Sequence, residues 1–354
     1  MSGFAAHSTN NKPVAIVDDL SAAWKGLAPR FVAYFASPAI EPETLAAELK
    51  TAFPGATQIG CTTAGELVSG KMFKGGVAAL ALPAELAGDP AVELVTSISA
   101  RPQGVVDALG RLAARFDLPA SELRLDEHLG LILIDGLSRS EERVMDLIGN
   151  ECDATFVGGA AGDDLRFVAT HVSVDGRAAT DAAALALLRP PRGFDFIKTQ
   201  SFRKLPARLV ATKVDEAART VLEFDGGPAA PAYAAALGVS VEDLPKHFMR
   251  HPVGLMVGDD PFVRSPLRVD GQGVVFYCNI KQGMELALLE STDIVSDTAK
   301  AIQARVAKGD VAALLNFHCI LRTLELESRG QTGAYGEELI GHMNQTSTIV
   351  CFRR

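Results

Sequence analysis

The chain has 354 residues, 48% of them hydrophobic and 22% charged, which is typical of a globular protein large enough for two domains. Its net charge is −9 and no basic block stands out, which argues against a nucleic-acid partner and against an anionic membrane surface. The apolar runs, such as 131–134 and 182–188, are too short to span a bilayer.

The N-terminus and the cysteines indicate a cytoplasmic protein. The stretch MSGFAAHSTNNKP has neither a basic nor an apolar segment, so we expect no signal peptide and a disordered tail over residues 1–12. The cysteines are odd in number and far apart, which favours reduced, buried thiols in a reducing compartment. They are Cys61, Cys152, Cys278, Cys319 and Cys351.

The first part of the chain follows a pattern of strand, helix, strand, turn and strand. FVAYFAS (31–37) predicts a strand, and Pro42 opens a helix with apolar residues at helical spacing. TQIGCTT, which begins at Thr57, predicts the second strand, and GGVAALALP (75–83) predicts the closing one. A half-buried strand and a helix follow, over 92–100 and 104–116.

The same pattern recurs in the middle of the chain. LGLILIDGL (129–137) predicts a fully apolar strand, and SRSEERVMDLIGNE predicts a helix with Ser138 or Ser140 as its N-cap. TFVGGAA predicts the next strand. FVATHVSVDG and AAALALLR then form either an antiparallel pair or a longer excursion.

A third copy appears near the C-terminus. VAALLNFHCIL (311–321) predicts the strand, RTLELES begins the helix, GAYGEEL (333–339) is the turn, and TSTIVCF (346–352) is the closing strand. The three turns align as Gly65-Glu66, Gly162-Asp163 and Gly336-Glu337. Three approximate copies of one unit carry more weight than a single glycine-rich match.

These strands predict a mixed α+β fold. Some strands are wholly apolar and so buried on both faces, whereas others, such as RLVATKV and GVVFYCNI, alternate and face water on one side. We therefore expect a layered αββα-like arrangement of mixed sheets with outer helices, built from the repeated units, rather than a doubly wound parallel sheet. The GG-P turn near residue 226 divides the chain into a tail and first segment, 1–27, and two domains, 28–225 and 226–354.

With these pieces in place, the chain resembles FIST proteins, which have a FIST N-terminal and a FIST C-terminal domain. Four stretches carry the resemblance and cover much of residues 30–354 in the expected order. They are IGCTTAGEL (59–67), FVGGAAGDD (156–164), HPVGLMVGDDPFVRSPLRVDGQGVVFYCNIKQGMELAL (251–288) and GAYGEELIGHMNQTSTIV (333–350).

The resemblance implies an intracellular sensory role in signal transduction. FIST domains are regarded as binders of small ligands, and amino acids have been proposed. We expect no bound cofactor. One subfamily binds haem b, senses nitric oxide and acts with histidine kinases or cyclic-dinucleotide enzymes. The family provides no catalytic residues to transfer, so we expect a sensor rather than an enzyme. No kinase or receiver module is recognisable here, so the output would pass through a signalling partner such as a histidine kinase.

The three glycine-rich turns, called corners below, have two interpretations that are compatible with each other. Phosphate binding is disfavoured, because the loops lack the lysine of a Walker A motif and Asp163 would repel phosphate. Close packing of backbones would explain the glycines, and Gly65 or Gly162 would need a positive φ. A pocket floor is the functional interpretation, in which threonine hydroxyls and the acids meet a ligand ammonium. Its residues are Cys61, Thr62, Thr63, Glu66, Asp163 and Glu337.

Two arginines and three further polar residues complete the candidate ligand-binding set. Arg264, and Arg322 at the end of the strand NFHCIL, could bind a carboxylate bidentately, although a solvent-facing or ion-paired role is the alternative. Cys319 lies beside Arg322, and the stretch 333–350 adds Tyr335 and Asn344. A cysteine hydrolase built on Cys61 is disfavoured because no base can be assigned from the sequence. A pure interaction scaffold remains open, although aromatic residues are sparse.

Noncovalent haem is the alternative cofactor, because no C-x-x-C-H attachment motif is present. The candidate axial ligands are His318, His251 and His342, of which His251 and His342 lie in stretches that carry the resemblance. His318 lies in an apolar strand, where a hydrogen-bonded structural role is the competing interpretation. His128 sits in polar surroundings and is expected to be solvated. No metal site is expected, because adjacent strand residues such as His318 and Cys319 point to opposite faces.

Overall fold

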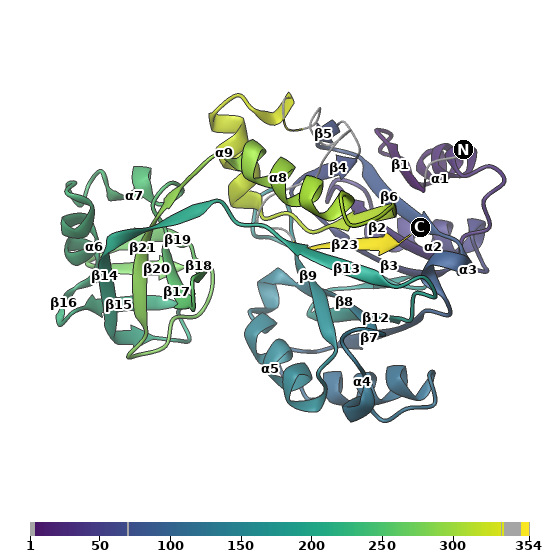
Figure 1. The fold of residues 1–354 in the computed structure, drawn as a ribbon, viewed down its shortest axis with the longest axis horizontal. Coiled ribbons are helices and arrows are strands. Elements are labelled where there is room, and N and C mark those ends of the chain that lie inside the picture. Colours follow the sequence, from purple (N-terminus) through teal and green to yellow (C-terminus); the bar gives the residue numbers. More distant parts are fainter. Residues whose placement is uncertain (1–3, 69–70, 334, 336–347, 354) are drawn as a thin grey trace. The chain divides into compact units, whose positions relative to one another are not determined.

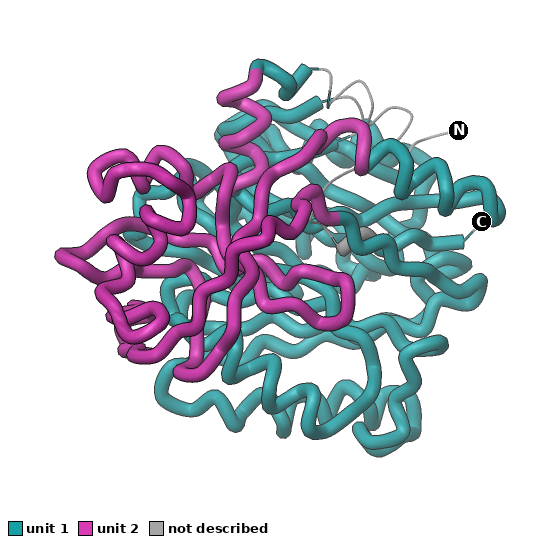
Figure 2. The backbone as a smooth tube through the Cα atoms, turned by 60° about the vertical axis from the view of Figure 1, so that its left-hand side comes forward, with its two compact units in different colours: residues 1–199, 298–320, 330–354 teal, residues 200–297, 321–329 magenta. Residues whose placement is uncertain are grey.

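The computed structural model describes residues 4–68, 71–333, 335 and 348–353, which form two compact units (Figure 2). The first unit comprises residues 1–199, 298–320 and 330–354, and the second comprises residues 200–297 and 321–329. The second unit is therefore built from two segments inserted into the chain of the first.

The described residues pass three times through a related order of elements (Figure 1). The first copy contains β1 (Ala5–Ser8), α1 (Pro13–Ala23), β2 (Phe31–Ala36), α2 (Pro42–Ala52), β3 (Thr57–Thr62), β4 (Glu66–Val68), β5 (Lys71–Phe73) and β6 (Val77–Leu82), with α3 (Ala84–Ala87) after it. The second contains β7 (Ala91–Thr96), α4 (Gly104–Ala114), β8 (Leu129–Asp135), α5 (Glu141–Glu151), β9 (Thr155–Ala161), β10 (Val172–Val174), β11 (Arg177–Ala179) and β12 (Ala182–Leu188).

The third copy is interrupted. It begins with β13 (Phe194–Lys198), continues after the inserted unit with α8 (Ile294–Val306) and β22 (Val311–Asn316), and includes α9 (Ile320–Ser328) and β23 (Thr348–Arg353). Most of α9 belongs to the second unit. The predicted turn at 333–339 lies outside the described residues except for Gly333 and Tyr335.

The three sheets share one strand order, which confirms the predicted repeat. The orders are β1-β6-β2-β3-β10-β11, β7-β12-β8-β9 and β13-β23-β22. In each copy the closing strand runs antiparallel to the strand next to it in the sheet order, as β6 with β2, β12 with β8, and β23 with β22. The helix-connected pairs β2–β3 and β8–β9 are parallel, so their carboxyl ends lie at the same edge of each sheet.

The three sheets pack on one shared core, and helices cover their outer faces, in agreement with the predicted αββα-like layering. The inner faces pack together through residues such as Phe31, Leu131 and Phe352. Separate outer cores lie under α1 and α2, and under α4 and α5, which cover the β7–β12–β8–β9 sheet in Figure 1. Ile302 of α8 covers the third sheet. Each fully buried leucine or isoleucine contributes about 2 kcal/mol through burial, so these layers hold the strand ends in fixed positions.

The N-terminal segment departs from the sequence prediction of a disordered tail. Strand β1 pairs antiparallel with β6. The Ser8 hydroxyl donates to the Asp19 carboxylate over 2.6 Å, and the Trp24 indole N–H donates to the Phe4 carbonyl over 3.1 Å. The prediction of disorder for residues 5–8 was therefore wrong, because pairing with a strand about 70 residues away leaves no local signal in the sequence.

Other differences concern local elements. Strand β10 pairs with β3, whereas β12 pairs with β7 and β8, so the two segments expected as a possible pair lie in different sheets. The strand predicted over 311–321 ends at Asn316. Ser140 precedes α5 without forming a side-chain cap hydrogen bond.

Gly158 shows why the parallel pair β8–β9 needs a residue without a side chain. A Cβ atom on Gly158 would lie 1.6 Å from the backbone oxygen of Ile132 in the neighbouring strand. No rotation of a side chain relieves a clash with backbone. Close packing therefore accounts for this part of the VGGAA stretch.

The second unit is a strongly bent sheet with its own core. The long strand β14 (Phe202–Asp215) pairs with β21 (Glu285–Ser291) along one half and with β15 (Thr220–Phe224) along the other. The remaining elements are β16 (Gly227–Pro228), α6 (Ala229–Leu237), α7 (Leu244–His247), β17 (Val253–Val257), β18 (Asp260–Arg264), β19 (Pro266–Asp270) and β20 (Gly273–Phe276). Tyr233 and Phe248 pack in the hydrophobic core of this unit, with ring centroids 5.9 Å apart.

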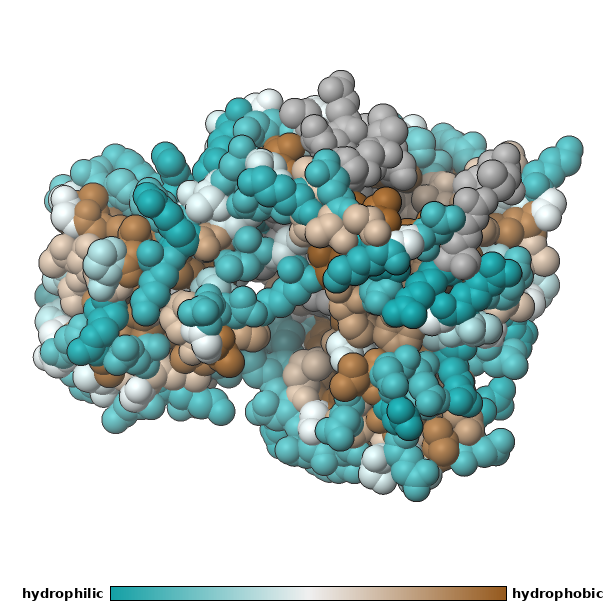
Figure 3. All heavy atoms as spheres, viewed as in Figure 1, coloured by the Kyte–Doolittle hydropathy of each residue, from teal (hydrophilic) through white to brown (hydrophobic). Residues whose placement is uncertain are grey.

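The surface carries apolar side chains in separate patches among hydrophilic ones on the face drawn in Figure 3. Across the described part of the chain, every helix is too short or too polar to cross a membrane.

His128 is fully buried, contrary to the expectation that it is solvated. Its Nδ1 atom accepts the backbone N–H of Arg124 over 3.1 Å, and its ring meets Phe116 edge-on at 5.7 Å. The Nε2 atom has no hydrogen-bond partner. Burial lowers the pKa of His128, because a buried imidazolium loses hydration.

We expect this histidine to destabilise the fold in acid. Its pKa is lower in the folded protein than in the unfolded chain, so the unfolded chain binds the proton more tightly and stability falls as the pH drops below about 6.5. Urea unfolding followed by the fluorescence of Trp24, the sole tryptophan, measures this between pH 8 and pH 5. The His128→Gln variant should lose that part of the acid sensitivity, whereas exposed His7→Gln should retain it. An unchanged profile in His128→Gln would contradict the assignment.

Candidate functional site

Two of the three predicted corners meet in the first unit. The Gly162 N–H donates to the Thr62 carbonyl over 2.9 Å, which joins the ends of β9 and β3. A Cβ atom on Gly162 would lie 3.0 Å from the backbone nitrogen of Ala64, so this glycine permits the close approach. Its φ is not positive, whereas Gly65 has a φ of 150°. Close packing therefore accounts for Gly162, whereas the positive φ of the backbone accounts for Gly65.

The third copy reaches the same region through an aromatic contact. Phe317, directly after β22, meets Phe35 of β2 edge-on with 5.9 Å between ring centroids. Tyr335 is buried, and its ring lies 5.7 Å from that of His318. The other predicted residues of this copy, Glu337, His342 and Asn344, lie outside the described residues.

Asp163 organises the loop that follows β9. Its carboxylate accepts the backbone N–H groups of Phe167, Val168 and Ala169. The residues between them include Asp164 and Leu165 at positive φ, which costs energy for side chains other than glycine. The buried carboxylate offsets that strain, so most of its acceptor capacity serves the loop.

Glu66 has a different environment. Its side chain is 2% exposed, and its Oε1 accepts the Thr63 hydroxyl over 2.8 Å. The Oε2 atom is buried and has no hydrogen-bond partner. Burial raises the pKa of Glu66 to about 7, and the hydrogen bond from Thr63 and the backbone N–H of Gly76 oppose this rise. Glu66 is therefore about half protonated at neutral pH.

Thr62 and Thr63 tie the corner together through their side chains and backbone. The backbone N–H of Thr63 donates to the Ala36 carbonyl at the end of β2 over 2.9 Å. The Thr62 hydroxyl accepts the backbone N–H of His171 over 3.0 Å, and the His171 carbonyl accepts the N–H of Thr62 over 2.9 Å. Both threonines thus position Glu66 and His171.

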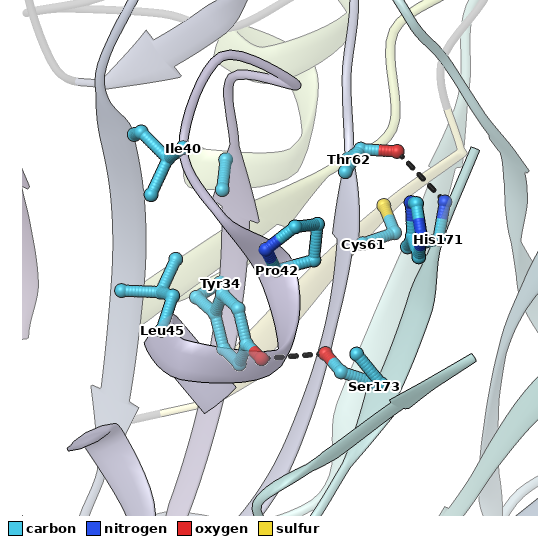
Figure 4. A pocket seen from close by; sticks show the side chains of 10 residues that line it. Tyr34, Ile40, Pro42, Leu45, Cys61, Thr62, His171 and Ser173 are labelled. Carbon is cyan, nitrogen blue, oxygen red and sulfur yellow. Dashed lines mark hydrogen bonds between the residues drawn. The ribbon is translucent and has the colours of Figure 1, made fainter. Parts of the chain in front are cut away.

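A small pocket lies beside this corner (Figure 4). Cys61 and His171 both line it, and the Tyr34 hydroxyl is 2.5 Å from that of Ser173 at its far end. The Nδ1 atom of His171 is buried without a hydrogen-bond partner. The pocket has room for about one water molecule.

Cys61 is poorly suited to attack a substrate in this arrangement. Burial raises the pKa of the Cys61 thiol to about 12, and the thiolate is the nucleophilic form. His171 lines the same pocket as Cys61, but the thiol stays neutral near pH 7. The expectation that the protein is not an enzyme stays a prediction.

Asp135 is a buried residue of this region that sequence reasoning missed. It ends β8, and its carboxylate accepts the backbone N–H groups of Leu137 and Asp181 and the hydroxyl of Thr170. These hydrogen bonds hold the segment before β10 and the residue before β12 close to the end of β8. An acid that closes an otherwise apolar strand was the signal available in LGLILIDGL.

The predicted arginines belong to the second unit. Arg264 ends β18, and its guanidinium donates to the carbonyls of Phe262 and Val263. Arg322 lies in α9 rather than at a strand end, and its buried guanidinium stands over the ring of Phe202 at 5.3 Å. Their proposed role in binding a carboxylate stays a prediction.

The five cysteines differ in burial. Cys61, Cys152 and Cys351 are buried, Cys278 is half-buried and Cys319 is exposed. The expectation of a buried thiol was wrong for Cys319, because the chain has left β22 before this residue and enters α9 directly after it.

The predicted haem ligands occupy dissimilar positions. His318 lies in the connection after β22 and not within an apolar strand, so the argument that its neighbour Cys319 faces the opposite way no longer applies. His251 lies between α7 and β17, and burial lowers its pKa. The pocket beside Cys61 is far too small for a porphyrin. Haem binding stays a prediction, which the absorption spectrum of the purified protein with and without haem would test.

Comparison with known families identifies the class of protein. The FIST N domain model matches residues 30–227, and the FIST C domain model matches residues 229–352. The chain therefore belongs to the FIST family, whose domains are associated with the sensing of small ligands in signal transduction. The two matches meet within β16, inside the second compact unit.

A curated relative is similar over part of the chain. The uncharacterized protein MJ1623 of Methanocaldococcus jannaschii is 27% identical over 184 residues, which is 48% of this chain. The matched region spans 35% of that protein's length, about a third.

Proposed function

We propose that the protein is a cytoplasmic sensor whose first unit binds a small polar metabolite, such as an amino acid, where the ends of β3 and β9 meet. The observation that carries this proposal is a pair of buried polar atoms without hydrogen-bond partners, Glu66 Oε2 and His171 Nδ1. Such atoms are costly in a folded protein, and a polar ligand would satisfy them. Membership of the FIST family supports a sensory role.

Binding would have to change the corner. The adjoining pocket has room for about one water molecule, so a larger ligand would fit only after the strand ends or the loop after Asp163 move apart. A ligand that binds the opened corner more tightly than the closed one shifts the protein toward the open state. A signalling partner, such as a histidine kinase, would then recognise that state.

Thermal unfolding with a panel of amino acids and related metabolites tests this function. A specific ligand at 100 times its Kd should add about 2.7 kcal/mol to the free energy of unfolding and raise Tm, as Trp24 fluorescence would report. The Thr63→Val variant, which loses the hydrogen bond to Glu66, should bind more weakly. Thr220→Val in the second unit removes a similar hydroxyl and should bind normally. Absence of stabilisation by every compound would contradict the proposal.

A further inference from the structure

The two oxygens of Glu66 differ in a way that specifies a partner. Oε1 already accepts the Thr63 hydroxyl over 2.8 Å, whereas Oε2 is buried without a hydrogen-bond partner. The backbone N–H of Gly76 lies close enough to lower the pKa of the carboxyl group, but it does not complete the hydrogen bonding of Oε2. The side chain is 2% exposed, so bulk water does not complete its hydrogen bonds. Oε2 is therefore a single acceptor atom on a group that carries negative charge when ionised.

The surrounding charges narrow the chemistry further. Asp164, on the loop after β9, adds negative charge near Glu66, and Lys74, after β5, adds positive charge. Of the two, Asp164 has the larger effect on Glu66, so the position disfavours a carboxylate or phosphate. A guanidinium binds best to two carboxylate oxygens at once, and Thr63 already occupies one of them. An ammonium group donates single hydrogen bonds from a compact charge and therefore suits one acceptor.

We propose that Glu66 Oε2 is the acceptor for a primary ammonium group of the ligand, which rests on the sensory function proposed above. In the free protein at neutral pH, about half of the molecules carry a proton on Glu66. In those molecules, binding transfers that proton from the carboxyl group to solvent and leaves a carboxylate paired with the ammonium. No covalent bond other than the carboxyl O–H is broken, and no other reactant is needed.

This assignment gives binding a defined pH dependence. Only the ionised carboxylate accepts the ammonium ion pair, so the apparent affinity follows the ionised fraction of Glu66. With a pKa of about 7, the apparent Kd should be about tenfold weaker at pH 6 than at pH 8. An alkylammonium ligand keeps its own charge across this range, since alkylamines such as the lysine side chain titrate near pH 10.

The test uses ethylammonium as the probe and tetramethylammonium as the control, at equal ionic strength. Both are cations, but tetramethylammonium has no N–H to donate. Ethylammonium should raise Tm of the full chain, more at pH 8 than at pH 6, and tetramethylammonium should leave it unchanged. The Glu66→Gln variant should show no rise with either cation. Titration calorimetry in two buffers of different ionisation enthalpy should detect proton release at pH 7 in the wild type alone.

The outcomes separate this inference from the broader function. Equal stabilisation by the two cations, or an ethylammonium response that survives in Glu66→Gln, would overturn the ammonium site. If a metabolite from the panel binds Glu66→Gln as well as it binds the wild type, the sensory function stands and the assignment to Glu66 falls. If ethylammonium raises Tm in the wild type but not in Glu66→Gln, and no metabolite binds, the ammonium site is supported and the metabolite-sensing function is contradicted.

Discussion

Replacing Glu66 by glutamine is expected to raise the free energy of unfolding at pH 8 by about 3 kcal/mol. The pKa of this carboxyl rises from 4.5 to about 7 on folding, and each pH unit between these values is worth about 1.4 kcal/mol. A raised pKa means that the folded protein holds the proton more tightly than the unfolded chain. The stability from Glu66 is therefore complete below pH 4.5, falls as the pH rises to about 7, and stays lost above it.

Glutamine resembles the protonated carboxyl in shape and cannot ionise, so Glu66→Gln should remove this decline. Urea unfolding followed by Trp24 fluorescence measures it at half-unit intervals from pH 4.5 to pH 8. Glu85→Gln, at an exposed carboxylate, is the control and should follow the wild type. The acid sensitivity from His128 has the opposite sign and is common to all three proteins, so it cancels in the comparison. If the variant and the wild type have equal stability at pH 8, Glu66 is not a buried acid.

Replacing Asp163 by asparagine is expected to destabilise the first unit by about 2 kcal/mol. The carboxylate accepts three backbone N–H groups of residues 167–169. An amide has one acceptor oxygen, and its NH₂ group would face N–H donors instead of pairing with them. Hydrogen bonds to a charged acceptor contribute about 1.5–3 kcal/mol each, and partial rearrangement of the loop should reduce the loss.

The matched control is Asp164→Asn, the same chemical change at the next residue, which is exposed. Asparagine tolerates the positive φ at this position nearly as well as aspartate, so stability should change by less than about 0.5 kcal/mol. Hydrogen exchange at the amides of 167–169 gives an independent measurement, since Asp163→Asn should lower their protection while Asp164→Asn leaves it intact. Equal stabilities for the two variants would show that Asp163 does not organise the loop.

Much of the fold could be predicted from periodicity. Apolar strands such as 129–135 and helices with one apolar stripe can be recognised from the local sequence, and their threefold recurrence indicated the repeated unit. Strand β1 could not be found in this way, because it is short, mixed in composition and defined by its pairing with β6. The apolar run NFHCIL is ambiguous between strand and helix, which explains why the predicted strand extended past Asn316 into α9.

The candidate site was predictable in position but not in the roles of its residues. Glycine followed by an acid located the corners at Glu66 and Asp163. Nothing in the sequence distinguishes an acid that accepts three loop N–H groups from one with an unpaired oxygen, because that difference depends on backbone that folds around each side chain. His171 could not be assigned to the corner either, since its partner Thr62 lies 109 residues earlier in the chain.

The insertion of the second unit constrains the order in which the first can be completed. The first two sheets are made from residues 5–188, so they can form while the rest of the chain is still being synthesised. The third sheet cannot, because its middle strand is β23, near the end of the chain, and β13 and β22 flank it on either side. During synthesis β13 must therefore wait unpaired while about 150 further residues, including the whole second unit, emerge from the ribosome.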